Sequence, residues 1–291
     1  MLGNDRWAMD LIDDVAHRLQ HIWGHHVAVV NVRVHLRDRA VFDTVSLDGS
    51  SVVVKVDTEP RRLARELLML RAAADGGIPV PAVLLAKSGL PGFLVLTVAE
   101  GHALSAVSPL VAWADAGRHL RRLHDLARPP DIPQFNQAGG DWREFLLRWT
   151  DRATRTVTSA GVLSPNEVRR LRSQLSMAFR EMGDPECRLL HGDCQPDHFF
   201  IEPRTGSLTA LIDFGDARIG DPTWDFAVLT LRHPQRLRAA LDGYRPGSRL
   251  QEHIRRWTPA YRTLRSIGVV NWLADNGLDY GEDLEFLRQR L

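Results

Sequence analysis

The chain has 291 residues, of which 44% are hydrophobic and 25% are charged. This composition is typical of a globular protein with a sizeable core and excludes a disordered chain. A formal net charge of +1 argues against binding to the phosphate backbone of nucleic acids, because such proteins normally carry a basic surplus. A chain of this length usually folds into two domains or lobes.

The sequence favours a reducing compartment. Only two cysteines, Cys187 and Cys194, are present, so the chain is not a disulfide scaffold. The first residues show no apolar run followed by a cleavage site, and Phe93–Val98 is far shorter than the roughly 20 residues of a membrane-spanning helix. We therefore expect a cytoplasmic protein without a membrane partner, and nothing indicates an obligate protein partner.

The first hundred residues predict one helix and then a run of short strands. Apolar residues at helical spacing predict a helix from Trp7 to Trp23. Short β-branched runs follow, which predict strands. The predicted strands cover residues 26–35, 40–47, 51–56, 80–85 and 93–98. The Asp48-Gly49 pair is typical of a hairpin turn between the second and third strands.

A second helix is inserted among these strands. It is expected to begin after Pro60 and to end at Gly76-Gly77. Its predicted apolar face carries Leu63, Leu67, Leu70 and Ala74. Residues 1–100 therefore predict an antiparallel sheet with one inserted helix.

The remaining residues predict a mostly helical region. One helical face carries Trp113, Gly117, Leu120 and His124, the last interpreted as a core histidine. Ser164 followed by Pro165 and Glu167 predicts a helix that begins with a capping box. One hairpin interrupts the helices, with strands at 199–201 and 208–212.

Two acidic motifs flank that hairpin. The first, HGDCQPDH, covers residues 191–198, and the second, DFGD, covers residues 213–216. A hairpin that folds back on itself brings Asp193 and Asp213 together. One carboxylate can then accept a proton while the other holds a divalent metal, as phosphoryl transfer requires. The two motifs together indicate this chemistry more strongly than either does alone.

On these motifs the chain resembles the aminoglycoside phosphotransferase family, small-molecule kinases with the protein-kinase-like fold. HGDxxPxH followed by IDFGDAxIGDPxxDF is most similar to the 2″-aminoglycoside and macrolide phosphotransferase branches. The resemblance implies an α+β, two-lobed fold. Residues 1–100 would form a small antiparallel-sheet N-lobe that binds the nucleotide, and residues 101–291 a mostly helical C-lobe with the catalytic loop and the substrate region.

The resemblance also implies roles for the motif residues. Asp193 would be the catalytic base and Asp213 the principal Mg²⁺ ligand. His198 stands where the family usually has Asn, and an imidazole suits Mg²⁺ less well than an oxygen ligand. We assign His198 to the metal, the alternative being a hydrogen-bonding residue beside it. His191 and Asp225 are expected to support the catalytic loop.

Nucleotide-binding residues follow from the same resemblance. Lys55 and Glu66 would form the ion pair that fixes the lysine on the nucleotide phosphates; without the motifs, both would be interpreted as solvated surface residues. The residues expected to bind the purine edge are Thr97, Val98 and Ala99.

The loop at residues 36–40 should cover the phosphates but contains no glycine, unlike that of protein kinases. Arg37 or Arg39 could supply charge there; the alternative is an ordinary hairpin tip.

The expected function is Mg²⁺-dependent transfer of the γ-phosphate of ATP or GTP to a hydroxyl of a small molecule. Only 12 positions separate Asp213 from Asp225, too few for the long segment on which protein kinases dock peptides. An aminoglycoside or related antibiotic is the preferred acceptor, because such polycations suit an acidic wall. Asp279, Glu282 and Asp283 could supply it, or could simply form a solvated helix face.

Other functions stay open at this point. The same fold phosphorylates choline, homoserine, sugars, macrolides and peptide antibiotics, and the motifs do not separate these acceptors. A nucleotide-binding pseudokinase is disfavoured by the presence of Lys55, Asp193 and Asp213. A DNA-linked regulator would need a basic patch and a recognition helix, and the sequence indicates neither.

Overall fold

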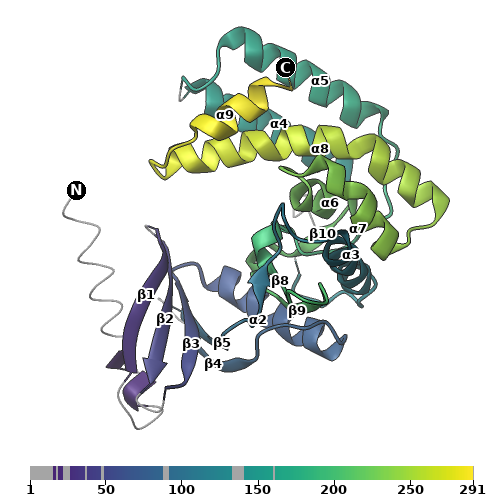
Figure 1. The fold of residues 1–291 in the computed structure, drawn as a ribbon. Coiled ribbons are helices and arrows are strands. Elements are labelled where there is room, and N and C mark those ends of the chain that lie inside the picture. The colour runs from purple at the N-terminus through teal and green to yellow at the C-terminus, as the bar shows by residue number, and fades with distance from the viewer. Residues whose placement is uncertain are drawn as a thin grey trace. The chain divides into compact units, whose positions relative to one another are not determined.

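The chain divides into two compact units in a computed structural model, and Figure 1 labels their elements. The structure describes residues 16–17, 19–21, 27–36, 38–46, 49–87, 92–132, 141–159 and 161–290. Unit 1 comprises Met1–Glu100 and Ala210–Gly215, and unit 2 comprises Gly101–Thr209 and Asp216–Leu291. Residues 210–215, which the sequence assigned to the helical region, therefore cluster with unit 1. Within the described part of the chain, no helix has both the length and the apolar character needed to cross a membrane.

Unit 1 is built on an antiparallel sheet whose described strands lie in the order β1-β2-β3-β5-β4 (Figure 1). Their bounds are β1 Val27–His35, β2 Arg39–Ser46, β3 Ser51–Asp57, β4 Val83–Lys87 and β5 Gly92–Thr97. Side chains alternate between the faces of a strand, and Val52, Val54 and Val56 of β3 are all buried. Lys55 therefore lies on the opposite face of β3 from Val54 and Val56.

The helix α2, Pro60–Asp75, contacts β3, β4 and β5 and starts with the expected proline. Its buried face differs from the predicted one. The buried residues are Leu63, Glu66, Met69, Leu70 and Ala73, whereas Leu67 is only half-buried and Ala74 is exposed. The helix thus turns a carboxylate, Glu66, toward the interior, and a buried carboxylate needs a partner.

Other sequence predictions for unit 1 need correction or lie outside the described residues. The fourth strand begins at Val83 instead of residue 80, since Pro81 has no N–H to donate to a ladder. Most of the helix predicted from Trp7 to Trp23 lies outside the described residues; residues 16–17 and 19–21 are described and are helical. Asp48 is also outside them, and Gly49 has a φ of 82°.

Unit 2 combines helices with short strands. The helices are α3 Leu110–His124, α4 Trp142–Ser159, α5 Pro165–Glu181, α6 Thr223–Leu229, α7 Leu237–Tyr244, α8 Ser248–Asp275 and α9 Gly281–Arg288. The short strands are β6 His102–Ala103, β7 Arg188–Leu190, β8 Phe199–Ile201 and β10 Arg218–Gly220, together with β9 Leu208–Leu211, whose last two residues cluster with unit 1. The long helix α8 contacts α4, α5, α6 and α9 (Figure 1).

Two local predictions for unit 2 are confirmed. The predicted apolar face of α3 is buried, and a side chain at Gly117 would place its Cβ 1.9 Å from the carbonyl oxygen of Ala240 on α7, so this contact between helices requires glycine. At the start of α5, the Ser164 hydroxyl accepts from the Glu167 N–H and the Glu167 carboxylate accepts from the Ser164 N–H. This is the predicted capping box.

The predicted hairpin is present as well. β8 and β9 are neighbours in a sheet of order β6-β8-β9, and the turn between them is closed by the Glu202 N–H, which donates to the Ser207 carbonyl at 2.9 Å. The fold class predicted from the sequence, α+β with an antiparallel sheet in the N-terminal region and helices in the C-terminal region, is confirmed.

Candidate active site

Unit 1 holds a lysine between two carboxylates. Lys55 Nζ donates to Glu66 Oε1 at 2.6 Å and to Asp213 Oδ1 at 2.8 Å. The Glu66 side chain is only 3% exposed. Burial alone would lower the pKa of Lys55, but the charges and hydrogen bonds of the two carboxylates outweigh it and hold the pKa above its ordinary value. Lys55 is therefore a permanent, fixed positive charge.

Asp213 has an unusual backbone. Its φ is 67°, in the left-handed region that non-glycine residues rarely occupy, and such outliers concentrate at functional sites. Its side chain is 37% exposed, so the carboxylate is accessible although one oxygen binds Lys55. Two residues later, the carbonyl of Gly215 accepts from Arg65 Nη1 of α2 at 2.8 Å. The DFG turn is thus fixed to the same helix that carries Glu66.

The glycine-free loop between β1 and β2 is shorter than expected, because Arg39 and Ala40 already belong to β2. Its Asp38 carbonyl accepts from the Thr58 N–H at 2.9 Å, and its Asp38 carboxylate pairs with Arg62 of α2 at 3.2 Å. Arg37 lies outside the described residues. Ion pairing therefore anchors this loop, and its predicted role over the phosphates stays a prediction.

The structure distinguishes the three residues expected to bind the purine. The Thr97 N–H donates to the Ala82 carbonyl at 3.0 Å, and the Thr97 hydroxyl accepts from the Ala82 N–H at 2.9 Å. Val98 and Ala99 follow the end of β5, and Val98 is 37% exposed. Because the N–H of Thr97 is already bonded, Val98 and Ala99 are the better placed of the three for backbone contacts.

In unit 2, both oxygens of the Asp193 carboxylate are held. Arg265 Nη2 of α8 donates to Oδ1 at 2.5 Å, and Gln195 Nε2 donates to Oδ2 at 3.1 Å. The Asp193 side chain is 16% exposed. Neither partner was predicted from the sequence. Gln195 lies within the motif and could have been found there, but Arg265 is 72 positions away and carries no local signal.

The loop that carries Asp193 is held by Asp225, which is fully buried. The Asp225 carboxylate accepts from the backbone N–H groups of His191 at 2.8 Å and Gly192 at 3.0 Å, and from His124 Nε2 at 3.0 Å. Burial raises the pKa of Asp225, yet the hydrogen bond and charge of His124, with help from His191, bring the pKa below its ordinary value. Asp225 and His191 are thus in contact with each other, as expected of residues that support this loop.

Two further contacts shape the loop. A side chain at Gly192, where φ is 86°, would place its Cβ 2.1 Å from the Asp216 carbonyl oxygen, so only glycine fits. His124, interpreted from the sequence as a core residue, is buried and also contacts the Tyr244 hydroxyl through Nδ1 at 2.9 Å. It belongs to the core and also supports Asp225.

His198 lies in the short 3₁₀ turn η1, Pro196–His198, and its Nδ1 is 2.7 Å from the Asp193 carbonyl oxygen. Because a carbonyl only accepts, Nδ1 carries a hydrogen, and in a neutral ring Nε2 then keeps its lone pair. This is the tautomer that a metal-binding imidazole needs. The hydrogen bond equally fits the alternative, a residue that orders the loop, and the assignment to the metal stays a prediction.

The donor chemistry fits Mg²⁺ carried by a nucleotide. Among the described residues, no group of three His, Cys, Asp or Glu side chains could hold a metal ion by itself. Mg²⁺ is usually bound by one or two carboxylates together with substrate phosphates and water. The accessible carboxylate of Asp213 suits that mode of binding.

Two other features, one beside Asp193 and one at the C-terminus, have partners within the fold. The Cys194 thiol is fully buried, and burial together with Asp225 and Asp193 holds its pKa well above the ordinary value. In the predicted acidic wall, Asp283 pairs with Arg232 and Asp279 Oδ1 accepts from the Gly281 N–H at 2.9 Å. Glu282 lies exposed in the first turn of α9, where a negative charge suits the helix dipole.

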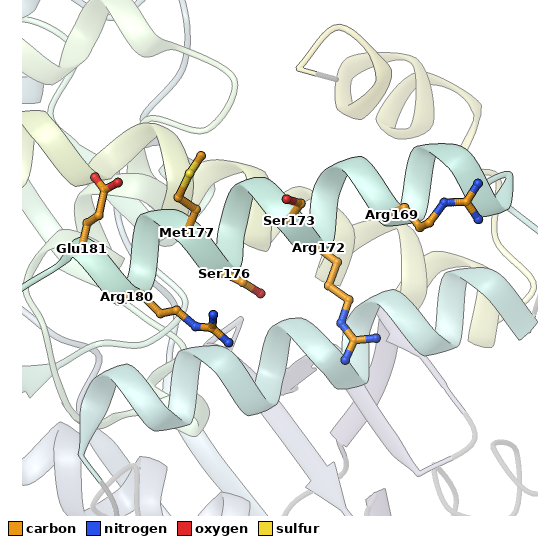
Figure 2. Close-up of a pocket in the computed structure, with 7 residues that line it drawn as sticks. All are labelled: Arg169, Arg172, Ser173, Ser176, Met177, Arg180 and Glu181. Atoms are coloured by element: carbon orange, nitrogen blue, oxygen red, sulfur yellow. The ribbon is translucent and has the colours of Figure 1, made fainter.

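A surface hollow lies elsewhere, along α5 (Figure 2). It is lined by Arg169, Arg172, Ser173, Ser176, Met177, Arg180 and Glu181. Arg172 pairs with Asp151 of α4 at 2.8 Å. Since the hollow is lined by a single helix and by none of the predicted site residues, we do not assign the chemistry to it.

Comparison with known proteins identifies the family and the fold. The sequence pattern of the phosphotransferase enzyme family matches residues 36–267. A thermostable mutant of aminoglycoside phosphotransferase APH(4)-Ia, solved as a ternary complex with ADP and hygromycin B, is 17% identical with a TM-score of 0.70, covering 95% of this chain and 96% of that chain. The GDP complex of aminoglycoside 2′-phosphotransferase-IIIa is 20% identical with a TM-score of 0.68, covering 96% and 98%.

A further relative is the uncharacterized protein YcbJ of Bacillus subtilis (strain 168), which is 33% identical over 79 residues, covering 25% of this chain and 26% of that protein. The chain thus matches about a quarter of the length of that relative. The solved structures show a shared fold, and the family pattern extends over well more than half of the chain. The resemblance drawn from the motifs is confirmed: the chain belongs to the phosphotransferase enzyme family.

Proposed function

We propose that the protein is a Mg²⁺-dependent kinase that transfers the γ-phosphate of ATP or GTP to a hydroxyl group of a small molecule. The observation that carries this proposal is the contact of Lys55 with both Glu66 and Asp213. Three positions that the sequence assigned to nucleotide and metal, at 55, 66 and 213, form one charged cluster.

Each group has a role in this reaction. Asp193 accepts the proton of the acceptor hydroxyl as that oxygen attacks the γ-phosphorus. Lys55 neutralises charge on the nucleotide phosphates, and Glu66 holds the lysine in place. Asp213 would hold Mg²⁺, with His198 Nε2 as a second ligand. When bound, Mg²⁺ supplies positive charge that stabilises the phosphates during transfer.

For the acceptor, we propose an aminoglycoside or a related antibiotic. APH(4)-Ia, which shares the fold, was solved with hygromycin B. At the C-terminus, the exposed Glu282 and Asp275 leave negative charge for a polycation even though Asp283 is paired with Arg232. Small-metabolite alcohols such as choline and homoserine, and macrolides, are the competing acceptors that an experiment has to separate.

The test is a nucleotide-consumption screen. Purified protein with Mg²⁺ and either ATP or GTP is offered hygromycin B, a second aminoglycoside, a macrolide, choline and homoserine, and products are checked for added phosphate by mass spectrometry. We expect consumption that depends on one acceptor. Asp193→Asn should lower turnover about 10²- to 10⁴-fold, the range for a positioned proton acceptor, while nucleotide binding persists.

The matched control is Asp197→Asn, because Asp197 is an exposed carboxylate of the same loop. It should retain wild-type turnover. A wild-type protein that phosphorylates none of these acceptors, or an Asp193→Asn variant with full activity, would contradict the proposal.

A further inference from the structure

Arg265 is the cation that contacts the catalytic carboxylate in unit 2. Its Nη2 lies 2.5 Å from Asp193 Oδ1, and the two side chains are 20% and 16% exposed. A hydrogen bond between two charged groups in such a partly buried place is stronger and more directional than a neutral one. Together with Gln195 on Oδ2, it restrains both oxygens of one carboxylate.

The rest of α8 fixes the position of Arg265. One turn earlier, the buried Arg262 donates to the Thr230 hydroxyl of unit 2. The neighbouring Tyr261 hydroxyl donates to Asp221 at 2.7 Å. Leu264 and Ile267 of the same helix are fully buried. The guanidinium is therefore presented by a helix held on several sides, and its planar shape allows less variation in geometry than an ammonium would.

An ionised carboxylate offers about four lone-pair positions for hydrogen bonds. Arg265 and Gln195 use two of them, so positions remain for the hydrogen bond from an acceptor hydroxyl. Displacement of a catalytic group by about 1 Å can cost roughly 100-fold in rate. A contact from α8 that keeps the Asp193 carboxylate in place would therefore increase the rate.

We propose that Arg265 is a positioning residue, which holds the Asp193 carboxylate in the orientation that accepts the proton of the acceptor. This inference rests on the proposed phosphotransfer and adds a residue that neither motif contains. Arg265 acts through Asp193 and does not itself exchange a proton or bind the acceptor.

The first test separates positioning from binding. Arg265→Gln should lower kcat about 10- to 100-fold, while KM for the nucleotide and for the acceptor found in the screen changes by less than about threefold. Arg265→Lys should recover part of kcat because it restores the charge without the planar fork. Arg255→Gln is the control, since Arg255 is exposed on the same helix and should leave both constants unchanged.

The second test is a double-mutant cycle. If Arg265 acts only through Asp193, then Arg265→Gln made on top of Asp193→Asn should cost less than about twofold, because the orientation it controls no longer matters. Thermal unfolding of all variants is followed in parallel. A structural role alone would lower the unfolding temperature of Arg265→Gln and would add fully to the effect of Asp193→Asn.

Failure of this inference is distinguishable from failure of the proposed function. An active wild-type protein whose Arg265→Gln variant is equally fast or faster overturns the positioning role alone, as does a rise in acceptor KM with kcat unchanged, which would make Arg265 an acceptor-binding residue. A wild-type protein that transfers no phosphate to any acceptor overturns the proposed function, and the positioning role with it.

Discussion

The two charged clusters of this chain hold central groups of opposite charge. In unit 1 a cation, Lys55, lies between the carboxylates of Glu66 and Asp213. In unit 2 an anion, Asp193, lies between a guanidinium and an amide, on a loop whose backbone N–H groups are bound by the fully buried Asp225. In the first cluster the cation is held by side-chain carboxylates. In the second the anion is held by side-chain donors, and its backbone is held as well.

This difference predicts how each cluster fails when it is altered. Removal of a charge beside Lys55 should disturb nucleotide binding while most of the fold persists. Removal of Asp225 should disturb the fold first, since its carboxylate replaces water for two backbone groups and one imidazole in the interior. The predictions below test this contrast, beginning with the largest expected effect.

Asp225→Asn should lower the free energy of unfolding by about 3 kcal/mol, because the amide offers one acceptor oxygen where the carboxylate accepts three buried hydrogen bonds, and its NH₂ group then faces another donor. Unfolding in urea, followed by circular dichroism, measures this change. The matched control is Asp242→Asn, an exposed carboxylate on α7, which should stay within about 0.5 kcal/mol of wild type. Equal stability of the two variants would remove Asp225 as the support of the loop.

Lys55→Ala and Glu66→Ala should each weaken nucleotide use about 10- to 100-fold in kcat/KM, since hydrogen bonds to charged groups are worth about 1.5–3 kcal/mol. The double variant should lose less than the product of the two single losses, because the residues share one task. Lys87→Ala is the control, as Lys87 is the chain's other lysine and is exposed. Strictly multiplicative losses would show that Lys55 and Glu66 act independently.

His198→Asn should change the metal preference by several-fold and leave Mg²⁺-supported turnover largely intact. The asparagine amide can still donate to the Asp193 carbonyl, so the loop contact is preserved. Nitrogen ligands suit Mn²⁺ and Co²⁺ better than Mg²⁺, so the ratio of Mn²⁺- to Mg²⁺-supported kcat should be higher in the wild type. Identical ratios in the two proteins would leave His198 only its hydrogen bond within the loop.

Ser164→Ala should cost about 1 kcal/mol of stability, the usual contribution of a helix cap, without any effect on catalysis.

The capping hydrogen bonds lower the pKa of Glu167 from 4.5 to about 2 in the folded chain. The contribution of Glu167 is therefore fully present above pH 4.5 and is lost as the pH falls toward 2. Urea unfolding of wild type and Glu167→Gln should differ at pH 7 and converge near pH 2.

Features with a local signature could be predicted from the sequence. The capping box at Ser164 needs only four adjacent residues. The pair of Lys55 and Glu66, 11 positions apart, was predicted only through the family resemblance. The buried face of α2 was misjudged because hydrophobic periodicity counts Glu66 as a surface residue. The burial of Glu66 depends on the charge of Lys55, which lies on strand β3.

Features that depend on distant pairing could not be predicted. Arg265 is one of 37 basic residues, and nothing near it in sequence distinguishes it from the others. The contact of His124 with Asp225 joins residues 101 positions apart, and the partner that neutralises Asp283, Arg232, lies 51 positions away. The acidic residues grouped near the C-terminus therefore suggested a binding surface made of unpaired carboxylates, whereas Asp283 is paired with Arg232 in the fold.

The burial of Cys194 gives the chain an intrinsic probe of the loop that carries Asp193. Only an exposed thiolate reacts with alkylating reagents, and this thiol is both covered and held protonated beside Asp225. Its alkylation therefore requires local opening of the loop that carries Asp193. The rate of modification, resolved from that of Cys187 by peptide mass spectrometry, reports the opening free energy of this loop without nucleotide, acceptor or an introduced label.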